Sequence, residues 1–480
     1  MPDTAFVRFE ILPQQAPPLT ERGAVKWLRE NLFSSPFNAV LTLIGVTVVF
    51  LLVQASLPWL LNSVWTANSL KECREIVWAS AGPEATGACW ALIRERWHQF
   101  LFGFYPADLY WRPVLALGLL LIALAPVLYY GLRKPNVVLV GTVAALTMIA
   151  LALLDHNPTH LLVFALILIG LTATAWIAPK KLVVLTVLYP LLGFWLLYGG
   201  SLWGPVGVAI GFVLLAVVYK AAKPLLGVVV ATGVGTLAAA IWWLSVQTSV
   251  TTALQGAMPL GMTDVGSDEF GGFLLAFVIG VTAIGASLPI GILLALGRQS
   301  DMLLIKTLCV GFIEFVRGVP LITVLFTATL LLGYFLPPQT NFDVVLRVII
   351  LVTFFSAAYL AEVIRGGLAA LPKGQYEAAD ALGLDYWQAQ RLIVMPQALK
   401  VSIPGIVSTF IGLFKDTTLV AFVGLMDPLK GVTTIVRADT AWKGIYWEPY
   451  IFVGAIFFAV CFGMSRYSMY LEQKLKTDHR

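Results

Sequence analysis

The stretch KGQYEAADALGLDYWQAQRLIVMP, from Lys373 to Pro396, gathers charged and hydrogen-bonding side chains between two long apolar runs. The whole chain has 480 residues, of which 59% are hydrophobic and only 12% are charged. Soluble domains carry about a quarter charged residues, so most of this chain belongs in lipid. The stretch is therefore a short polar excursion from a membrane, and the runs around it define the class of fold.

The apolar runs favour transmembrane helices. Thr142–Leu154, Leu161–Ala178 and Val348–Ala361 contain no ionised side chain. Crossing about 30 Å of hydrocarbon takes roughly 20 apolar helical residues, whereas the strands of a barrel would give a much weaker alternating pattern. We predict an all-α polytopic membrane protein with about 12 transmembrane helices of this length.

The predicted spans form two groups with consistent basic flanks. Seven spans lie near 37–61, 113–132, 137–155, 161–178, 182–199, 205–222 and 225–245, and five lie near 273–297, 303–335, 344–370, 397–425 and 449–470. Lys and Arg concentrate in alternate short loops, and such loops stay in the cytoplasm. We therefore expect both termini to lie on the cytoplasmic side. The loop 427–448 fits less well, because it should lie outside yet carries Lys430, Arg437 and Lys443.

These features divide the chain into four predicted regions. They are a cytoplasmic tail over 1–36, an N-terminal membrane region over 37–245 with a periplasmic loop at 62–111, a periplasmic linker over 246–272, and a second membrane region over 273–475. The linker carries Asp264, Asp268 and Glu269 but no Lys or Arg, which suits an external position. We find no convincing repeat that relates the two membrane regions.

The outer loop holds two of the four cysteines, Cys73 and Cys89. A periplasmic position would expose them to an oxidising compartment, which permits a disulfide between them. The alternative is a pair of free thiols that pack as small hydrophobic groups among Trp78, Trp90 and Trp97. The four histidines are scattered through the chain without the spacing of metal ligands, so we expect no metal site.

The polar stretch can form a short helix that begins after Pro372 and runs over 374–390. Gly374 and Gln375 would open this helix. Glu377 would lie in its first turns, where a carboxylate suits the positive end of the helix dipole. An ordinary cytoplasmic loop, whose alanines simply favour helix, is the alternative for this segment taken alone.

The rest of the stretch has the composition of a surface that another protein contacts. Ala378 and Ala379 keep the helix surface low, so a partner can approach closely. Gly383 permits either a close contact or a left-handed turn. Tyr386 and Trp387 are rigid aromatic anchors of the kind that dominate interfaces.

Four elements, in order, resemble the permease subunits of polar amino-acid ABC importers. They are RGVPL at 317–321, RGG at 365–367 followed by LPKGQ at 371–375, the EAA loop from Glu377 through Gly383 to the IVMP ending at 393–396, and KDTTL at 415–419. The resemblance covers roughly residues 270 to 475. The preceding helices, with the cysteine-containing loop and FGFYP at 102–106, are similar to the long permease subunit of general L-amino-acid transporters.

The resemblance implies that 273–475 is a five-helix core of the type I importer permeases, in which 373–390 is a cytoplasmic coupling helix that docks on an ATPase. It implies a location in a bacterial inner membrane. It also implies a second homologous permease subunit, two ATPase subunits and a periplasmic amino-acid-binding protein as partners, and no nucleic acid. The chain has no Gly-Lys dipeptide and thus no phosphate-binding GxxxxGK[ST] loop. We therefore expect a subunit without catalytic residues or cofactors, with ATP and Mg on the partner ATPase.

Several charged and polar residues of the core lie in or beside predicted spans. They are Glu314, Arg317, Glu362, Arg365, Lys415, Asp416 and Thr417. Ionised groups at this depth are costly and are usually paired or face water. Glu362 and Arg365 are three residues apart, so one helical face can hold both. The alternatives for the set are helix packing, subunit contact or snorkelling on one side, and direct contact with an amino-acid substrate on the other.

Two other functions compete with the importer permease. An ion-coupled secondary transporter predicts internal repeats with helices broken at matched positions, and matching repeats are not evident. A membrane scaffold would use the N-terminal helices as anchors, but it leaves the four ordered elements unexplained.

Overall fold

The computed structural model describes residues 23–155, 157–335 and 343–475. Eleven of the described helices are long and apolar enough to cross a membrane, or twelve if one bent pair counts as a single span. The strands in these ranges are β1 (Gly200–Ser201) and β2 (Gly261–Met262), which form one antiparallel pair. The predicted all-α polytopic class is thus confirmed. Residues 1–22, most of the predicted N-terminal tail, lie outside the described part.

The chain divides into two compact units, which comprise residues 1–95 with 441–448, and residues 96–440 with 449–480. The first unit contains α1 (Gly23–Asn31), α2 (Pro36–Leu61), α3 (Leu70–Ala81) and the start of α4 (Ala91–Phe102). Ser35 caps α2 by accepting a hydrogen bond from the Asn38 amide, and Pro36 occupies its first turn, where no backbone donor is needed. No residue of α2 is buried within the described chain.

The first part of the second unit is a group of closely packed helices. Its elements are η2 (Ala107–Leu109), α5 (Trp111–Leu128), α6 (Arg133–Leu154), α7 (Pro158–Ile177), η3 (Pro179–Leu182) and α8 (Val183–Tyr198). Ile122, Val140 and Leu168 bring α5, α6 and α7 into one apolar cluster. These bounds agree closely with the predicted spans, because one apolar run forms most of each helix.

The helical segment after α8 extends beyond the two spans predicted near 205–222 and 225–245. α9 (Trp203–Ile241) contains a kink at Gly227, whose φ of 73° is outside the helical region, and η4 (Trp242–Val246) and α10 (Gln247–Ala257) continue the chain. Residues 247–257, which we expected in the external linker, are therefore helical. Their polar side chains do not oppose helix formation, and Gln255 accepts a hydrogen bond from Ser201.

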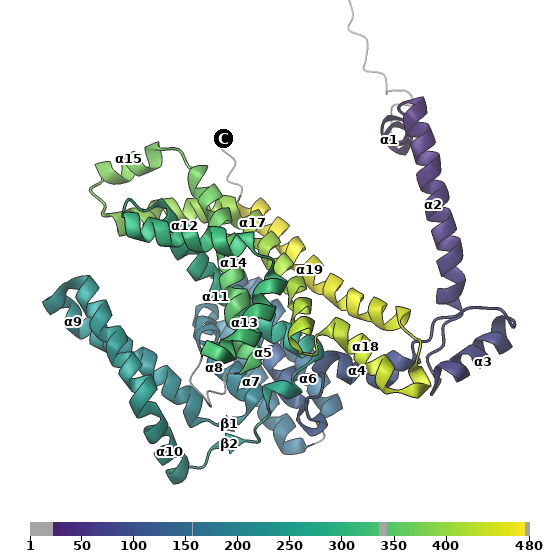
Figure 1. Cartoon of the computed structure of the whole chain (residues 1–480), viewed down its shortest axis with the longest axis horizontal. Helices are drawn as coiled ribbons and strands as arrows, with labels where there is room; N and C mark the ends of the chain where they lie inside the picture. Colours follow the sequence, from purple (N-terminus) through teal and green to yellow (C-terminus); the bar gives the residue numbers. More distant parts are fainter. Residues whose placement is uncertain (1–22, 156, 336–342, 476–480) are drawn as a thin grey trace, which may run out of the picture. The chain divides into compact units, whose positions relative to one another are not determined.

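The second part of this unit contains the segments that resemble importer permeases (Figure 1). Its elements are η5 (Ser267–Glu269), α11 (Gly272–Gln299), α12 (Leu303–Gly318), α13 (Leu321–Phe335), α14 (Val344–Ala369), α15 (Gly374–Ala381), α16 (Tyr386–Ala389), η6 (Gln390–Val394), α17 (Met395–Asp416), η7 (Thr417–Val423), α18 (Pro428–Ala438), η8 (Thr440–Trp442) and α19 (Trp447–Leu475). In Figure 1 the green helices α11, α12 and α14 lie in one group with α17.

The predicted single span over 303–335 is wrong in one respect. The structure breaks it into α12 and α13, which meet at an angle of 103°. Pro320 disfavours the helical conformation of the residue before it, and Val319 is indeed extended, with φ −109° and ψ 134°. The RGVPL element is therefore a sharp bend.

Small residues allow the core helices to approach closely. A Cβ atom at Gly367 of α14 would lie 2.6 Å from the carbonyl oxygen of Ala398 in α17, and one at Gly291 of α11 would lie 2.8 Å from the Leu360 Cβ of α14. Small side chains at helix contacts are the usual means of tight packing in membranes. α14 is therefore held between α11 and α17.

One apolar cluster joins the two parts of the second unit. It includes Leu115 of α5, Phe164 of α7 and Leu196 of α8, together with Leu275 of α11 and Val348 of α14. Tyr467 of α19 also donates a hydrogen bond to the carbonyl oxygen of Leu128 at the end of α5. The helices before the core are thus packed against it.

Candidate functional site

The segment predicted as a coupling helix consists of two short helices and a turn. α15 ends before Gly383, whose φ of 69° lies in the left-handed region that glycine adopts without strain. The Leu384 amide closes the turn by donating to the carbonyl oxygen of Ala379. Asp385 and Gln388 then form a reciprocal capping box that starts α16. A continuous helix over 374–390 is therefore not observed, because the left-handed turn ends it.

This segment presents an apolar surface away from the rest of the chain. The exposed fractions are 72% for Leu382, 54% for Tyr386 and 66% for Trp387. The two aromatic rings meet edge to face, with their centroids 5.3 Å apart. We call these three residues the coupling patch. Leu382 was missed in the sequence, although its position next to Gly383 at the end of an exposed helix could have indicated it.

Glu377 and Ala378 are also exposed, whereas Ala379 is fully buried. The side chain of Gln375 accepts a hydrogen bond from Gln397 of α17 at 2.9 Å. Tyr376 packs against the apolar cluster of the core helices, and burial raises the pKa of its hydroxyl. One side of α15 is thus attached to the core, and the other side is open to a partner.

A cluster of ion pairs lies at the ends of three core helices, and we call it the Glu362 cluster. Its members are Arg298 of α11, Glu314 and Arg317 of α12, and Glu362 and Arg365 of α14. The shortest contact of Glu362 is 2.8 Å, from its Oε1 to Nη1 of Arg298. Glu362 Oε2 lies 3.1 Å from Nε of Arg365 and 3.6 Å from Nη1 of Arg317.

The structure thus brings together four of the charged residues singled out in the sequence and adds Arg298. The ion pair between Arg298 and Glu362 could not be predicted, because Arg298 lies at the end of a different span. The residues around Arg298 do not indicate which acid it contacts. The Glu362 side chain is only 15% exposed. A carboxylate in this setting needs its cations, because removing charges from water is costly.

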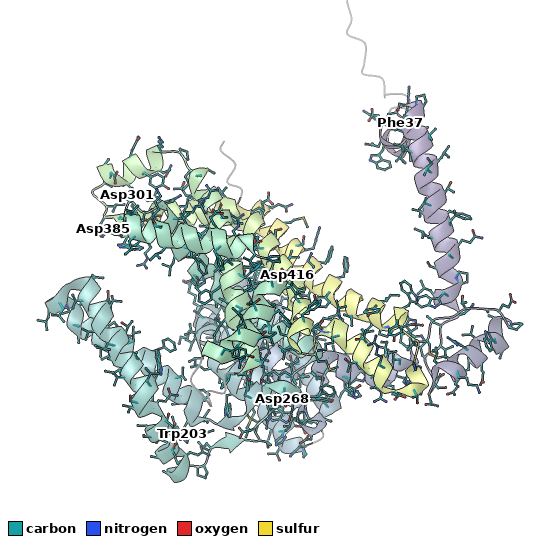
Figure 2. All side chains as sticks on the ribbon, viewed as in Figure 1. Phe37, Trp203, Asp268, Asp301, Asp385 and Asp416 are labelled. Atoms are coloured by element: carbon teal, nitrogen blue, oxygen red, sulfur yellow. A yellow bond between two sulfur atoms is a disulfide. The ribbon has the colours of Figure 1, made fainter. Side chains whose placement is uncertain are left out.

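Lys415, Asp416 and Thr417 lie elsewhere, at the junction of α17 and η7. Lys415 is exposed and Asp416 is half-buried, while the fully buried Thr417 donates a hydrogen bond to the carbonyl oxygen of Phe414. Among the described residues, no ion pair links Lys415 or Asp416 to the Glu362 cluster. Figure 2 shows Asp385 at the same end of the second unit as Asp301, with Asp416 away from both.

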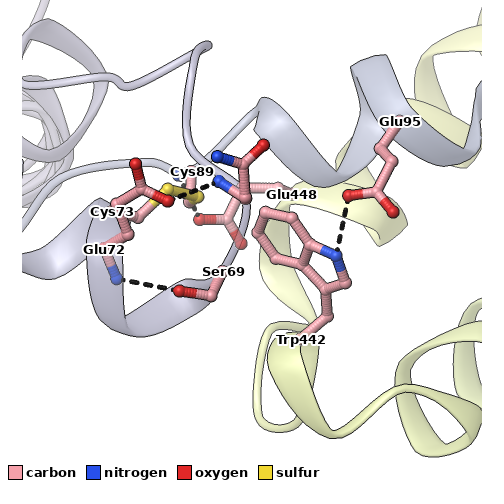
Figure 3. The surroundings of a disulfide bond; sticks show 8 residues. Ser69, Glu72, Cys73, Cys89, Glu95, Trp442 and Glu448 are labelled. Carbon is pink, nitrogen blue, oxygen red and sulfur yellow. Dashed lines mark hydrogen bonds between the residues drawn. A yellow bond between two sulfur atoms is a disulfide. The ribbon is translucent and has the colours of Figure 1, made fainter.

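Cys73 and Cys89 form a disulfide in the first unit, with their Cα atoms 6.0 Å apart (Figure 3). The Cys89 amide donates a hydrogen bond of 2.8 Å to Oε1 of Glu448, whose side chain is buried. Trp442 likewise donates through Nε1 to Oε2 of Glu95 (Figure 3). The bridge therefore belongs to a folded region that includes the segment 441–448.

The comparisons with known proteins agree with these features. Residues 287–477 match the family described as the inner membrane component of binding-protein-dependent transport systems. The chain is 61% identical over 480 residues to the glutamate/glutamine/aspartate/asparagine transport system permease protein BztC of Rhodobacter capsulatus, and the match covers 100% of both chains. It is 35% identical over 455 residues to the inner membrane amino-acid ABC transporter permease protein YhdY of Escherichia coli, covering 95% of this chain and 94% of that protein.

A shorter relative marks the extent of the common part. The glutamate/aspartate import permease protein GltK of Escherichia coli is 30% identical over 209 residues, which cover 91% of that protein but 42% of this chain. The chain belongs to the permeases of amino-acid ABC transporters. It is a multi-pass membrane protein, and its family gives no support to an ion-coupled secondary transporter.

Proposed function

We propose that this chain is the permease subunit of an ATP-driven importer whose substrates are glutamate, glutamine, aspartate and asparagine. The observation that carries the proposal is the 61% identity to a permease named for these four amino acids, over the full length of both chains. The match extends through the N-terminal helices as well as the core, so it is not confined to the part that resembles shorter permeases.

The coupling patch is the proposed contact with the ATPase. Leu382, Tyr386 and Trp387 are exposed at 54% or more, and exposed aromatic side chains next to a low, alanine-rich surface suit a protein interface. Gly374, Gln375, Glu377, Ala378, Ala379 and Gly383 position this patch. We propose two ATPase subunits, which bind ATP and Mg, while this chain binds no cofactor and catalyses no covalent step.

The family also supports a proposal for the remaining partners. We propose a second homologous permease subunit, because a five-helix core supplies half of a translocation path, and a periplasmic binding protein that delivers the amino acid. The coupling patch faces the cytoplasm in this arrangement, and both termini lie on the same side. ATP-driven closure of the ATPase pair displaces α15 and shifts the core helices between outward and inward access.

Reconstitution of the complete complex tests the proposal. The chain is purified with its partner permease and ATPase, placed in proteoliposomes, and supplied with binding protein and labelled glutamate or glutamine. We expect uptake that requires ATP and ceases when the ATPase loses its phosphate-loop lysine. Uptake that proceeds without ATP under an imposed ion gradient would refute the proposal.

A further inference from the structure

We propose that Glu362 is a positioning residue for transport. Its side chain holds α11, α12 and α14 together near the place where α15 packs against the core helices. Through this carboxylate, a displacement of α15 moves the ends of the three helices as one body. The inference rests on the proposed function, because it concerns how force from the ATPase reaches the translocation path.

The geometry makes Glu362 the centre of the Glu362 cluster. Its two carboxylate oxygens contact arginines from three helices, at 2.8, 3.1 and 3.6 Å. Glu314 differs, because it is 57% exposed and its ion pair is with Arg298. Loss of Glu362 would leave Arg317 and Arg365 without the carboxylate that they pair with, while Arg298 keeps its ion pair with Glu314. Repulsion between the two uncompensated guanidinium groups would then loosen the contact between α12 and α14.

The same helices receive the contact from α15. Tyr376 packs against a buried cluster that includes Leu296 of α11, Ile313 of α12 and Ile364 of α14. Gln375 is bonded to Gln397 at the start of α17. α15 is therefore attached to an apolar layer formed by the helices whose ends Glu362 joins, so a push on α15 acts on all of them.

The two connections have different physical characters. Apolar contacts such as those of Tyr376 are non-directional and let helices slide over one another. Ion pairs with short contacts and defined partners fix the relative position of the helix ends. Arg317 is further fixed by its guanidinium, which lies 5.4 Å from the centre of the Tyr359 ring on α14. The shortest contact of Glu362, at 2.8 Å, joins α14 to α11, and the longer contact with Arg317, at 3.6 Å, adds α12. The cluster is thus suited to keeping the ends of the three helices in register while α15 moves.

The test compares Glu362→Gln with Glu314→Gln in the reconstituted complex, measuring ATP hydrolysis and amino-acid uptake separately. For Glu362→Gln we expect ATP hydrolysis to continue while uptake per ATP falls about tenfold or more, since Arg317 and Arg365 lose the carboxylate that they pair with. For Glu314→Gln we expect a change below about twofold, as for other exposed ion pairs. Glu362→Asp, which keeps the charge on a shorter side chain, should lie between the two.

Rescue distinguishes positioning from a loss of folding. Adding Arg365→Gln to Glu362→Gln removes a cation whose ion pair is with Glu362, and it should restore part of the uptake per ATP. Glu362→Gln with wild-type uptake per ATP, or with ATP hydrolysis and uptake falling in proportion to a lower yield of complex, would overturn the inference.

Hydrogen exchange provides a measurement that does not depend on transport. In the purified complex, Glu362→Gln should increase amide exchange in the second half of α12, around Glu314 and Arg317, relative to the wild-type complex. Unchanged exchange in this part of α12 would overturn the inference, whatever substrate the complex transports. A wild-type complex without ATP-driven uptake would instead refute the proposed function.

Discussion

The helices α2 and α14 have the same length, 26 residues, and nearly the same hydropathy, 2.4 and 2.3 in their most apolar windows. Yet none of the 18 most apolar consecutive residues of α2 is buried within the described chain, whereas half of the corresponding residues of α14 are buried. Hydropathy reports that both helices prefer a non-aqueous solvent, which either lipid or protein can provide. It does not report which of the two surrounds a given helix.

The side chains of α14 explain its burial. Ser356, Ala357, Ala358 and Gly367 keep its surface low on the sides that face α11 and α17. Helices in a membrane gain little from apolar contact alone, because lipid is equally apolar, so close packing of small residues decides which ones associate. α2 is instead covered by large aliphatic side chains, and its window contains no Asp, Glu, Lys or Arg.

The largest expected effect comes from filling the closest approach of α14. Gly367→Leu adds a Cβ atom that would lie 2.6 Å from the Ala398 carbonyl oxygen, which is too close for the present packing. We expect a loss of about 1–3 kcal/mol or more in stability, as for other overpacked cores, together with loss of uptake. The yield of monodisperse complex and its thermal midpoint measure this.

The matched control for Gly367→Leu lies in α2. A Cβ at Gly45 meets nothing within 4 Å, so Gly45→Leu should leave the yield, melting and uptake unchanged. An equal loss for both variants would contradict the difference between the two helices.

A smaller effect is expected at the coupling patch. Trp387→Ala removes a side chain that is 66% exposed in this chain, and truncation of an aromatic anchor typically costs about 2 kcal/mol of binding energy. Copurification of the ATPase should therefore weaken, with ATP-driven uptake falling in parallel and the permease itself remaining folded.

Leu43 of α2 provides the comparison for Trp387, because it is 62% exposed. If lipid covers it, Leu43→Ala should leave ATPase binding intact. A Trp387→Ala variant that binds the ATPase with wild-type affinity would show that the coupling patch is not the docking surface.

The smallest effect on uptake is expected from the disulfide. Cys73→Ser opens a bridge with a sequence separation of 16 residues, which corresponds to about 3 kcal/mol of chain entropy in the unfolded state. This loss should be local, so protease cleavage between α3 and α4 should accelerate while uptake changes by less than about twofold, as expected for local opening.

Cys309→Ser, which removes a free thiol, is the control for general effects of cysteine replacement. Equal cleavage rates in Cys73→Ser and the wild-type protein would show that the bridge does not stabilise the outer region.

Much of the fold could be predicted because hydropathy is a local property of the chain. α5, α6, α7 and α14 begin and end within a few residues of the predicted spans. The errors occur where a polar or special residue acts against its surroundings. Pro320 bends a long apolar run, and α10 is helical although several of its residues are polar.

The candidate site divides in the same way. Glu377, Tyr386 and Trp387 could be recognised because a polar stretch between spans is visible in one segment of sequence. The partner of Glu362 on its own helix, Arg365, was also predictable from a spacing of three residues. Arg298 and Arg317 were not assigned to Glu362, because ion pairs between helices depend on how those helices pack.

The sequence by itself determined that this protein spans a membrane many times and that the residues around Glu377 form a polar stretch between two spans. It did so because transfer into lipid and helix geometry depend on neighbouring residues alone. Only the tertiary structure decided that α14 is enclosed while α2 is not, that Gly383 makes a turn between α15 and α16, and that Glu362 joins three helices. Those outcomes depend on contacts between segments distant in the chain, whose free energies no local pattern records.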